Sequence, residues 1–371
     1  MSSDNEYGVI PSKQSKRIAP PELAYLPPLP NSYRPGIALV GAGGVSEFHL
    51  RAYQTCNFNV LVIIDRSLNK AQQRRDQFFP KAETLTDYRE ILKRDDIEIV
   101  DATPHPSDRL PIIEDSLRAG KHVLSQKPFV LDLDDGQRLA SLAKDRNVRL
   151  AVNQSGRWAP HFSYLRKAIQ ADLIGQVTSI DFSLQWDQTW IAGNEGFEKI
   201  RHLILFDFAI HWFDMANCLM DNQKADTVYA LVTGFPGQLF QPPAVASATI
   251  GYPNAQVRLS FHGHTLRGEE DVTTIVGTKG LLRSRGPGLN EQSEIHLFTE
   301  SGHCRTPLNG CWFESGFQGA MGELICAIEE NREPLHSAEN NLKSLELCYA
   351  ALASADSGEI AKVGSVRKAM P

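Results

Sequence analysis

The earliest regular pattern in the chain joins two apolar runs through a glycine-rich turn, between residues 36 and 66. Residues 37–40 and 60–64 are continuous apolar runs of the length that is typical of buried strands. Between them, side chains suited to the covered face of a helix recur at helical spacing: Val45, Phe48, His49 and Ala52. The pattern predicts a strand, a turn, a helix and a second strand, in that order.

Helical and strand patterns continue to alternate up to residue 153. We expect further strands at 97–102, 121–125 and 149–153, a short segment around residue 84, and helices at 68–79, 87–93, 108–119 and 134–146. Gly120 follows the third of these helices, a position where glycine commonly ends a helix. Strands that alternate with helices of this length predict a parallel sheet, and therefore a Rossmann-like doubly wound domain over residues 36–153.

After residue 153 the apolar positions mostly alternate, which is typical of half-buried strands in an antiparallel sheet. In the first of these strands the expected covered face carries Ile180, Phe182, Leu184 and Trp186. We expect strands at 177–186, 227–233, 244–252, 255–262, 271–276, 280–285 and 294–299, and helices at 158–169, 202–220, 316–330 and 338–357. The fold class is therefore α/β, with a C-terminal α/β domain (154–371) built on a large, mostly antiparallel open sheet that also serves oligomerisation.

Residues 1–35 differ from both domains, because they are polar at first and proline-rich from residue 19 to residue 30. Repeated proline favours an extended path over a helix. A solvated tail explains the prolines, but Leu23, Tyr25, Leu26 and Leu29 are unusually apolar for such a tail. Both a disordered arm and a docked arm stay open, and we predict docking of residues 12–30 on the cofactor domain or on a partner subunit.

Composition excludes several classes of protein. The 371 residues carry a net charge of −6 with no basic block, which argues against a nucleic-acid partner. No apolar run approaches the roughly 18 residues of a membrane helix, and the start of the chain lacks the apolar core of a signal peptide. Six cysteines without a CxxC pair indicate reduced thiols and a cytoplasmic protein. A zinc site from His303, Cys304 and Cys311 is conceivable, but loop residues without metal are the favoured interpretation.

The glycine turn has the chemistry of a dinucleotide site. Gly41 permits the tight turn. At Gly43, Gly44 and Val45 a phosphate can approach the backbone and the N-terminus of the following helix. Asp65 ends the second strand, where a carboxylate can accept both hydroxyl groups of an adenosine ribose and would repel the 2′-phosphate of NADP. We therefore expect NAD as the cofactor, with NADP possible because Arg66 could pair with that phosphate.

Three local sequences carry a family resemblance: ALVGAGGVS from residue 38, DATPHPSDRL…AGKHVLSQKP from residue 101 and DFAIHWFD from residue 207. Together they resemble the Gfo/Idh/MocA family of NAD(P)-dependent oxidoreductases, over nearly all of residues 36–363. The chain departs from the family pattern at three positions: Gln126 stands for a glutamate, Asp108 for a histidine and Ala209 for a glycine. The first two departures affect the expected cofactor contacts.

The resemblance implies a set of site residues. Thr103, Pro104, His105 and Gln126 would line the cofactor together with Lys127, whose bond to the following proline is expected to be cis. Lys127 would polarise the substrate oxygen, His211 would be the general acid/base, and Asp207 would accept a substrate hydroxyl group or hold the histidine. We expect six residues to contact the substrate: Asp207, His211, Arg157, Trp158, His161 and Trp186. Aromatic and polar groups of this kind suit a sugar, a sugar acid or an inositol-like polyol.

The resemblance thus implies hydride transfer between a nicotinamide and a secondary alcohol or ketone, in a homodimer or homotetramer. Two alternatives remain open. One is a nucleotide-sensing regulatory protein of the same fold without turnover, which Gln126 mildly favours. The other is a glycosidase that oxidises its substrate transiently with NAD.

Overall fold

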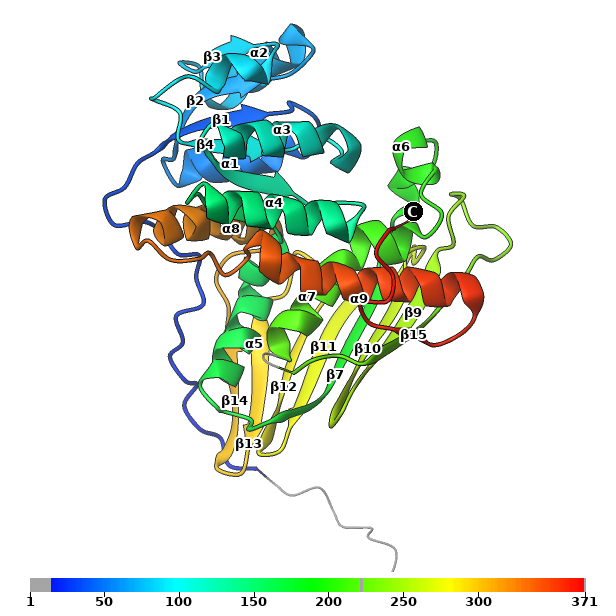
Figure 1. Ribbon diagram of the computed structural model, residues 1–371. Coiled ribbons are helices and arrows are strands. Elements are labelled where there is room, and N and C mark those ends of the chain that lie inside the picture. Colours follow the sequence, from blue (N-terminus) through cyan, green and yellow to red (C-terminus); the bar gives the residue numbers. More distant parts are fainter. Residues whose placement is uncertain (1–14, 221–222, 370–371) are drawn as a thin grey trace, which may run out of the picture.

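The structure, a computed structural model, describes residues 15–220 and 223–369 and contains two β-sheets with helices packed on them (Figure 1). The sheet at the top of Figure 1 is formed by the N-terminal half of the chain. A larger sheet lies below it, and the long helices α8 (Trp312–Glu329) and α9 (Ala338–Ser357) run between the two. The expected α/β fold class is confirmed.

The first sheet has six strands in the order β3-β2-β1-β4-β5-β6, and every pair is parallel. Its strands are β1 (Gly36–Val40), β2 (Asn59–Ile64), β3 (Glu83–Leu85), β4 (Ile99–Ala102), β5 (His122–Gln126) and β6 (Leu150–Asn153). Its helices are α1 (Ser46–Thr55), α2 (Leu68–Phe78), α3 (Pro106–Arg118) and α4 (Leu133–Asp145), and the helix expected at 87–93 is only a 3-10 turn, η1 (Tyr88–Ile91). The parallel sheet was predicted from strands that alternate with helices. Its strands read as continuous apolar runs, because each strand is covered by helices on both faces.

The second sheet has nine strands in the order β14-β13-β12-β11-β7-β10-β9-β8-β15, and its pairs are antiparallel except for β7 with β10. The strands are β7 (Val177–Gln185), β8 (Thr227–Thr233), β9 (Val245–Tyr252), β10 (Ala255–His262), β11 (Glu270–Gly277), β12 (Gly280–Gly286), β13 (Glu294–Thr299), β14 (Gly302–Pro307) and β15 (Ala361–Lys362). The two edge strands, β14 and β15, were not predicted, because one is polar and the other is two residues long.

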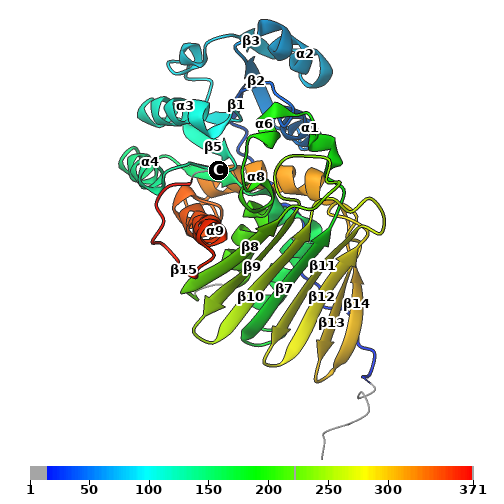
Figure 2. The ribbon, with the colours of Figure 1, turned by 90° about the vertical axis from the view of Figure 1, so that its right-hand side faces the viewer.

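Helices cover one face of the second sheet, and among the described residues no helix lies on the other face (Figure 2). The remaining helical elements are η2 (Ser155–Trp158), α5 (Pro160–Gln170), η3 (Thr189–Ile191), α6 (Glu195–Glu198), η4 (Ile204–Phe208) and α7 (Ile210–Leu219). The single helix expected at 202–220 is wrong in one respect: η4 is a π-helical turn that precedes α7. As predicted, the four apolar side chains of β7 and its end are buried on the covered face.

Helix α8 is the element that joins the two halves. Its residues Phe317 and Met321 are buried in the same apolar cluster as Ile37 and Leu39 of β1, and the ring of Phe317 stacks 5.8 Å from that of Phe48 on α1. Burying such side chains contributes about 1.5–3 kcal/mol each, so α8 is held firmly against the cofactor half although its sequence lies in the other.

The described part of the N-terminal arm is docked on its own chain. Ile18 donates its backbone N–H to His303 O (2.9 Å), and His303 donates to Lys16 O (2.8 Å), so the arm adds a short parallel bridge to β14. A side chain at Gly302 would overlap the carbonyl oxygen of Lys16, so the close approach requires glycine there. Figure 1 shows that the arm runs from the lower sheet up to β1. Docking is confirmed from residue 15 onward, but its place differs from the prediction, because residues 16–18 bind β14 of the second sheet and not the cofactor domain. Residues 12–14 lie outside the described residues.

Further along, the arm is fastened to the end of α8. The Glu329 carboxylate accepts the backbone N–H groups of Asn31 (2.8 Å), Ser32 (2.7 Å) and Tyr33 (2.9 Å). These bonds lower the pKa of Glu329 to about 2. Since the carboxylate is needed for all three, this contact is present above the ordinary carboxyl pKa and is lost as the pH falls towards 2.

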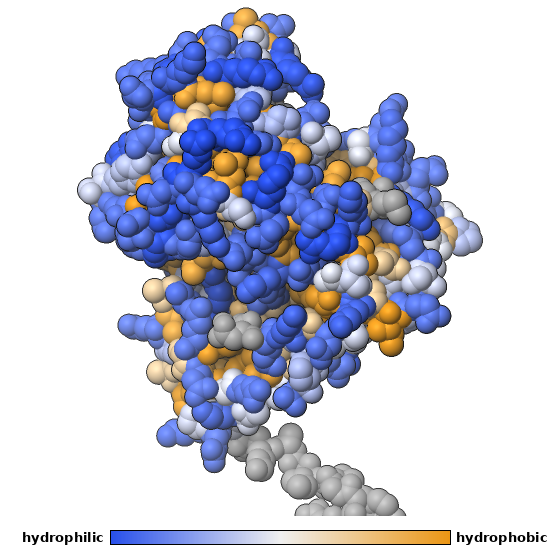
Figure 3. Space-filling model, in the orientation of Figure 1, coloured by the Kyte–Doolittle hydropathy of each residue, from blue (hydrophilic) through white to orange (hydrophobic). Residues whose placement is uncertain are grey.

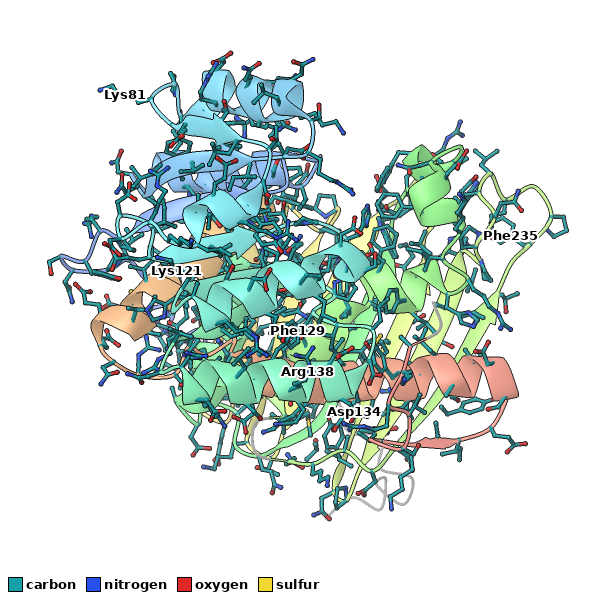
Figure 4. The ribbon with its side chains drawn as sticks, turned by 45° about the horizontal axis from the view of Figure 1, so that its top comes forward. Lys81, Lys121, Phe129, Asp134, Arg138 and Phe235 are labelled. Atoms are coloured by element: carbon teal, nitrogen blue, oxygen red, sulfur yellow. The ribbon has the colours of Figure 1, made fainter. Side chains whose placement is uncertain are left out.

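The surface in the view of Figure 1 is mostly polar, with scattered apolar patches (Figure 3). Among the described residues, no helix combines the length and the apolar character that crossing a membrane requires. Figure 4 looks onto the α3–α4 layer, where Arg138 of α4 pairs with Glu114 of α3 (Nη1–Oε2 2.7 Å).

Candidate active site

The glycine turn after β1 leaves room where a phosphate would lie. Gly41 has φ = 101°, and a Cβ there would lie 2.6 Å from Thr103 Oγ1, so only glycine fits. At Gly43 and Gly44 a Cβ would have no atom within 4 Å. Within the described chain, the backbone N–H groups of Gly43, Gly44 and Val45 donate to no protein acceptor. Free N–H groups beside open space at a helix N-terminus fit a pyrophosphate.

Asp65 lies where the resemblance and the strand pattern place it, directly after β2. Its carboxylate accepts the N–H of Ala42 (2.8 Å) and of Ser67 (2.8 Å), which fixes it beside the glycine turn. The neighbouring Arg66 is 90% exposed and pairs with Asp108 at 3.2 Å. The departure from the family pattern at position 108 therefore supplies a carboxylate that competes with any phosphate for Arg66.

The turn after β4 forms the adjoining edge of this site. Thr103 Oγ1 donates to Gly41 O (2.7 Å) and so ties the two turns together. The carbonyl oxygen of Pro104 accepts Arg109 Nη1 (2.6 Å), and His105 is the residue that precedes α3. Both turns follow parallel strands at their carboxyl ends, where ligands of open α/β sheets bind.

Lys127 connects the cofactor half to the second half of the chain. Its Nζ lies 3.1 Å from Asp207 Oδ2 and donates to Asp207 O at 2.8 Å, and both side chains are 15% exposed. Gln126 Oε1 accepts the Lys127 N–H (3.1 Å), so the glutamine keeps an acceptor at the position of the family glutamate. The bond between Lys127 and Pro128 is cis, as the resemblance implied.

His211 is the titratable ring next to this ion pair. Its Nδ1 is buried and has no hydrogen-bond partner among the described residues. The ring of Trp312 lies edge-on at 5.5 Å. Burial, and then the positive charge of Lys127, hold the pKa of His211 well below its ordinary value. The imidazole is therefore neutral at neutral pH, which is the state that accepts a proton.

Asp207 and His211 do not belong to one continuous α-helix, as their spacing of four had suggested. Asp207 lies in the π-helical turn η4, and His211 lies in the first turn of α7. π-helical turns are rare in proteins, but those that occur are often found at functional sites. Here the wider turn gives Asp207 its two contacts with Lys127, while His211 stays close enough for the ammonium to lower its pKa.

Two of the expected substrate residues lie next to this group. His161 is buried, its Nε2 has no partner within residues 15–220 and 223–369, and its ring is 5.9 Å from that of Trp312. Burial lowers the pKa of His161 to about 3. Trp186 packs 6.0 Å from Phe208, the neighbour of Asp207, and its buried Nε1 is also without a partner in the described chain. Buried polar atoms normally have partners, so both residues stay in the candidate set.

The structure does not bring Arg157 and Trp158 to this group. The Arg157 guanidinium forms a buried two-point ion pair with Asp214, in which Nε–Oδ2 and Nη2–Oδ1 are both 2.6 Å. Trp158 is buried against α8, where any side chain at Gly319 would overlap its indole. Both residues thus fasten η2 to α7 and α8, and their expected contact with substrate has no support in the geometry.

Sequence reasoning missed Trp312, which contacts both histidines. Its Nε1 donates to Ser155 Oγ (3.2 Å), so the indole is fixed over the start of the second half. It also missed Gln154, whose buried amide has neither donor nor acceptor satisfied by the described residues. Neither residue lies in a motif, and a tryptophan at a helix start reads as an ordinary core residue.

Comparisons with known proteins agree with this geometry. Residues 36–154 match the family model described as oxidoreductase family, NAD-binding Rossmann fold, and residues 162–283 match that of the GFO/IDH/MocA C-terminal domain. The chain is 24% identical over 323 residues to an inositol 2-dehydrogenase of Rhizobium meliloti, covering 85% of this chain and 95% of the relative. It is 24% identical over 361 residues to a D-apiose dehydrogenase of Paraburkholderia graminis, covering 90% and 91%.

The fold has close counterparts among solved structures. One is an oxidoreductase from Agrobacterium radiobacter in complex with NAD+, L-tartaric acid and magnesium, with a TM-score of 0.81 at 19% identity over 90% of this chain and 99% of that one. The matched models cover the first sheet and the second sheet as far as β12, and the glycine turn, Asp65 and Lys127 lie in their expected elements. The chain therefore belongs to the Gfo/Idh/MocA family of NAD-binding oxidoreductases.

Proposed function

We propose that the protein oxidises a secondary alcohol of a sugar, a sugar acid or an inositol-like polyol, or reduces the matching ketone, with Lys127, Asp207 and His211 as the catalytic group. The observation that carries the proposal is the ion pair between Lys127 and Asp207 (3.1 Å) beside a neutral histidine. The relatives named inositol 2-dehydrogenase and D-apiose dehydrogenase support the substrate class.

Each residue has a distinct task in this reaction. When NAD is bound in the first half of the chain, it would supply the acceptor for the hydride of the alcohol carbon. The alcohol proton has to leave at the same time, and neutral His211 takes it as general base, which is worth about 10²–10⁴ in rate. Lys127 stabilises the negative charge that develops on the oxygen. Asp207 positions the ammonium through its two contacts, and in the reverse direction His211 returns the proton.

The residues of the first half would hold NAD. Gly41, Gly43, Gly44 and Val45 provide the turn and the free N–H groups for the pyrophosphate, and Asp65 provides acceptors for the adenosine ribose. The remaining residues of the expected set flank the nicotinamide side: Thr103, Pro104, His105, Gln126 and Lys127. His161 and Trp186 support the substrate side together with Asp207 and His211.

We further propose a division into an arm (1–35), a dinucleotide-binding domain (36–153) and a substrate and oligomerisation domain (154–371). Helix α8 crosses this division by packing on α1. A homodimer or homotetramer would use the uncovered face of the second sheet. A cytoplasmic location is supported by the six cysteines, none of which forms a disulfide within residues 15–220 and 223–369.

The test is a screen of polyols and sugars with NAD, followed by the absorbance of the reduced cofactor, on the wild-type protein and on His211→Ala. We expect turnover with at least one polyol or sugar, a loss of about 10²–10⁴ in kcat in the variant, and an unchanged Kd for NAD. Cys218→Ala, also on α7, is the matched control and should keep full turnover. NAD binding without turnover on any substrate would favour the nucleotide-sensing alternative, and near wild-type turnover of His211→Ala would remove that residue from its role.

A further inference from the structure

Four polar side chains gather on the helix-covered face of the second sheet: Asp271, Thr273, Ser284 and Gln292. We call them the inner oxygen cluster. None is more than 3% exposed. Five of their oxygen atoms have no hydrogen-bond partner in the described chain, namely both carboxylate oxygens of Asp271 and one oxygen of each of the others. Gln292 Nε2 donates to the backbone O of Asp271 (3.0 Å) and so holds the glutamine beside the carboxylate.

Strand β11 buries two polar side chains in place of apolar ones. Asp271 and Thr273 are buried together with Ile275, whereas Val272, Thr274 and Val276 on the opposite face are only half-buried. A shift of one residue would bury the valines instead, so hydrophobicity alone favours the other orientation. Positions where a sequence breaks its own pattern in this way are commonly functional.

The cluster lies on the part of the sheet that faces the proposed active site. Asp271 is in register with Leu184 of β7, and Leu184 is in register with Phe261 of β10. The ring of Trp212, the residue after His211, lies 5.1 Å from the ring of Phe261. Asp271 and Phe261 therefore lie in the same row of the sheet, two strands apart, and Phe261 packs against the helix that carries His211.

The loop that holds the glutamine of the cluster leads to the same place. Asn290 Oδ1 in that loop accepts the backbone N–H of Phe313 (2.9 Å) at the start of α8. The preceding residue, Trp312, has its ring 5.5 Å from that of His211 and 5.9 Å from that of His161. Trp312 therefore links the loop of the cluster to both histidines.

We propose that the inner oxygen cluster is a binding site for hydroxyl groups of the substrate, with Asp271 accepting hydrogen bonds from two neighbouring hydroxyl groups of a polyhydroxylated ring. The proposal deepens the proposed function and rests on it. A carboxylate only accepts hydrogen bonds, whereas hydroxyl and amide groups can donate as well as accept, which matches the mixed donors and acceptors of a polyol. The ligand would reach the cluster past the side chain of Trp312.

The cluster suits a polyol better than a cation. It has a single carboxylate, whereas protein cation sites commonly use several, and burial raises the pKa of Asp271 to about 7. A group that is partly protonated at neutral pH attracts a cation weakly. Hydroxyl groups of a ligand would in turn satisfy oxygens that otherwise stay unpaired.

The test compares Asp271→Asn with the wild-type enzyme on the best polyol of the screen. We expect KM to rise about 10- to 100-fold, as for the loss of two buried hydrogen bonds, with kcat changed less than about threefold and the Kd for NADH unchanged. The matched control is Asp181→Asn on the other face of the same sheet, where Asp181 pairs with Arg258 (2.5 Å). It should leave KM unchanged. Thr273→Val, which keeps the shape of the side chain, should raise KM about threefold or more and replaces the first variant if that one does not fold.

The outcomes separate the inference from the proposed function. Turnover with an unchanged KM in both cluster variants overturns the inference alone. Calorimetric polyol binding to the NADH complex that weakens in Asp271→Asn, without turnover in the wild type, supports the inference and defeats the proposed function. No polyol binding to the wild type overturns both. A rise of Tm with Na+, K+, Mg2+ or Ca2+ that disappears in Asp271→Asn would identify a cation site instead.

Discussion

At the scale of single residues, Asp271 is unusual for a strand residue because its carboxyl group is fully buried. Burial raises its pKa to about 7, and Gln292 only partly offsets this. A carboxyl group whose pKa is higher in the folded than in the unfolded protein stabilises the fold at low pH. That contribution is complete below the unfolded value of about 3.8 and is lost as the pH rises through about 7.

We therefore predict that Asp271→Asn stabilises the ligand-free protein at pH 8, because the amide cannot ionise. The expected gain in the free energy of unfolding is on the order of 2–4 kcal/mol, at about 1.36 kcal/mol per pKa unit. Thermal melts at pH 8 and pH 5 measure it, and the gain should be clearly smaller at pH 5. A variant that is less stable than the wild type at pH 8 would contradict the prediction.

Asp65 should control the choice between NAD and NADP. Its carboxylate is fixed by Ala42 and Ser67, and the guanidinium of Arg66 is drawn to Asp108. We predict that Asp65→Asn weakens NAD binding about tenfold or more, through the loss of charged hydrogen bonds, and leaves NADP binding unchanged or tighter. Titration of both cofactors measures the ratio. Tighter binding of NADP than of NAD to the wild type would refute the assigned role.

The residues proposed as catalytic could be named from sequence because they lie in motifs that follow strands or open a helix. Asp271 was not, because β11 alternates and its register decides which set of side chains is buried. The sequence VTTIV between its ends favours burial of the valines. Only the pairing of β11 with β7 and β12 places the polar set inside.

At the scale of elements, a single carboxylate makes several of the contacts that hold the N-terminal arm. The carboxylate of Glu329 collects three backbone N–H groups of the arm, and its neighbour Glu330 instead pairs with Arg332 (2.5 Å). We predict that Glu329→Gln increases proteolysis within residues 15–34, while Glu330→Gln does not. Deletion of residues 1–30 should lower Tm as well. Equal cleavage of wild type and Glu329→Gln would show that the carboxylate does not hold the arm.

Most elements were predicted because burial imposes a clear period on them, and the exceptions have physical causes. The edge strand β14 is polar because half of it faces solvent, and it pairs with the arm on its free side. The π-helical turn η4 was read as part of one α-helix, because four of its five residues are large and apolar like those of the helix that follows. Its different winding depends on contacts with Lys127 that are distant in sequence.

At the scale of the whole molecule, the uncovered face of the second sheet is less apolar than expected. It carries ion pairs such as Arg258–Asp181, and one apolar row in which Val276, Leu281 and Phe298 are in register. A row of this kind, flanked by polar groups, is suited to a contact between copies of the chain.

We predict that Leu281→Glu shifts sedimentation at micromolar concentration towards the monomer. The matched control is Leu68→Glu, because Leu68 is an exposed leucine on α2, far from the sheet. A wild-type protein that sediments as a monomer, or an unchanged assembly in Leu281→Glu, would remove this face from consideration.

The course of the arm also decides how the protein can be attached to a solid support. Ser15 bonds to His303 at the lower end of the second sheet, far from the glycine turn, whereas the N–H of Ala369 bonds to Leu131 O, a few residues from Lys127. A bead or an electrode linked through the N-terminal end should therefore leave the cofactor side of the molecule open to solution. Linkage through the C-terminal end would place the support beside Leu131, which follows Lys127 and Pro128 in the chain, and should slow the exchange of cofactor and product.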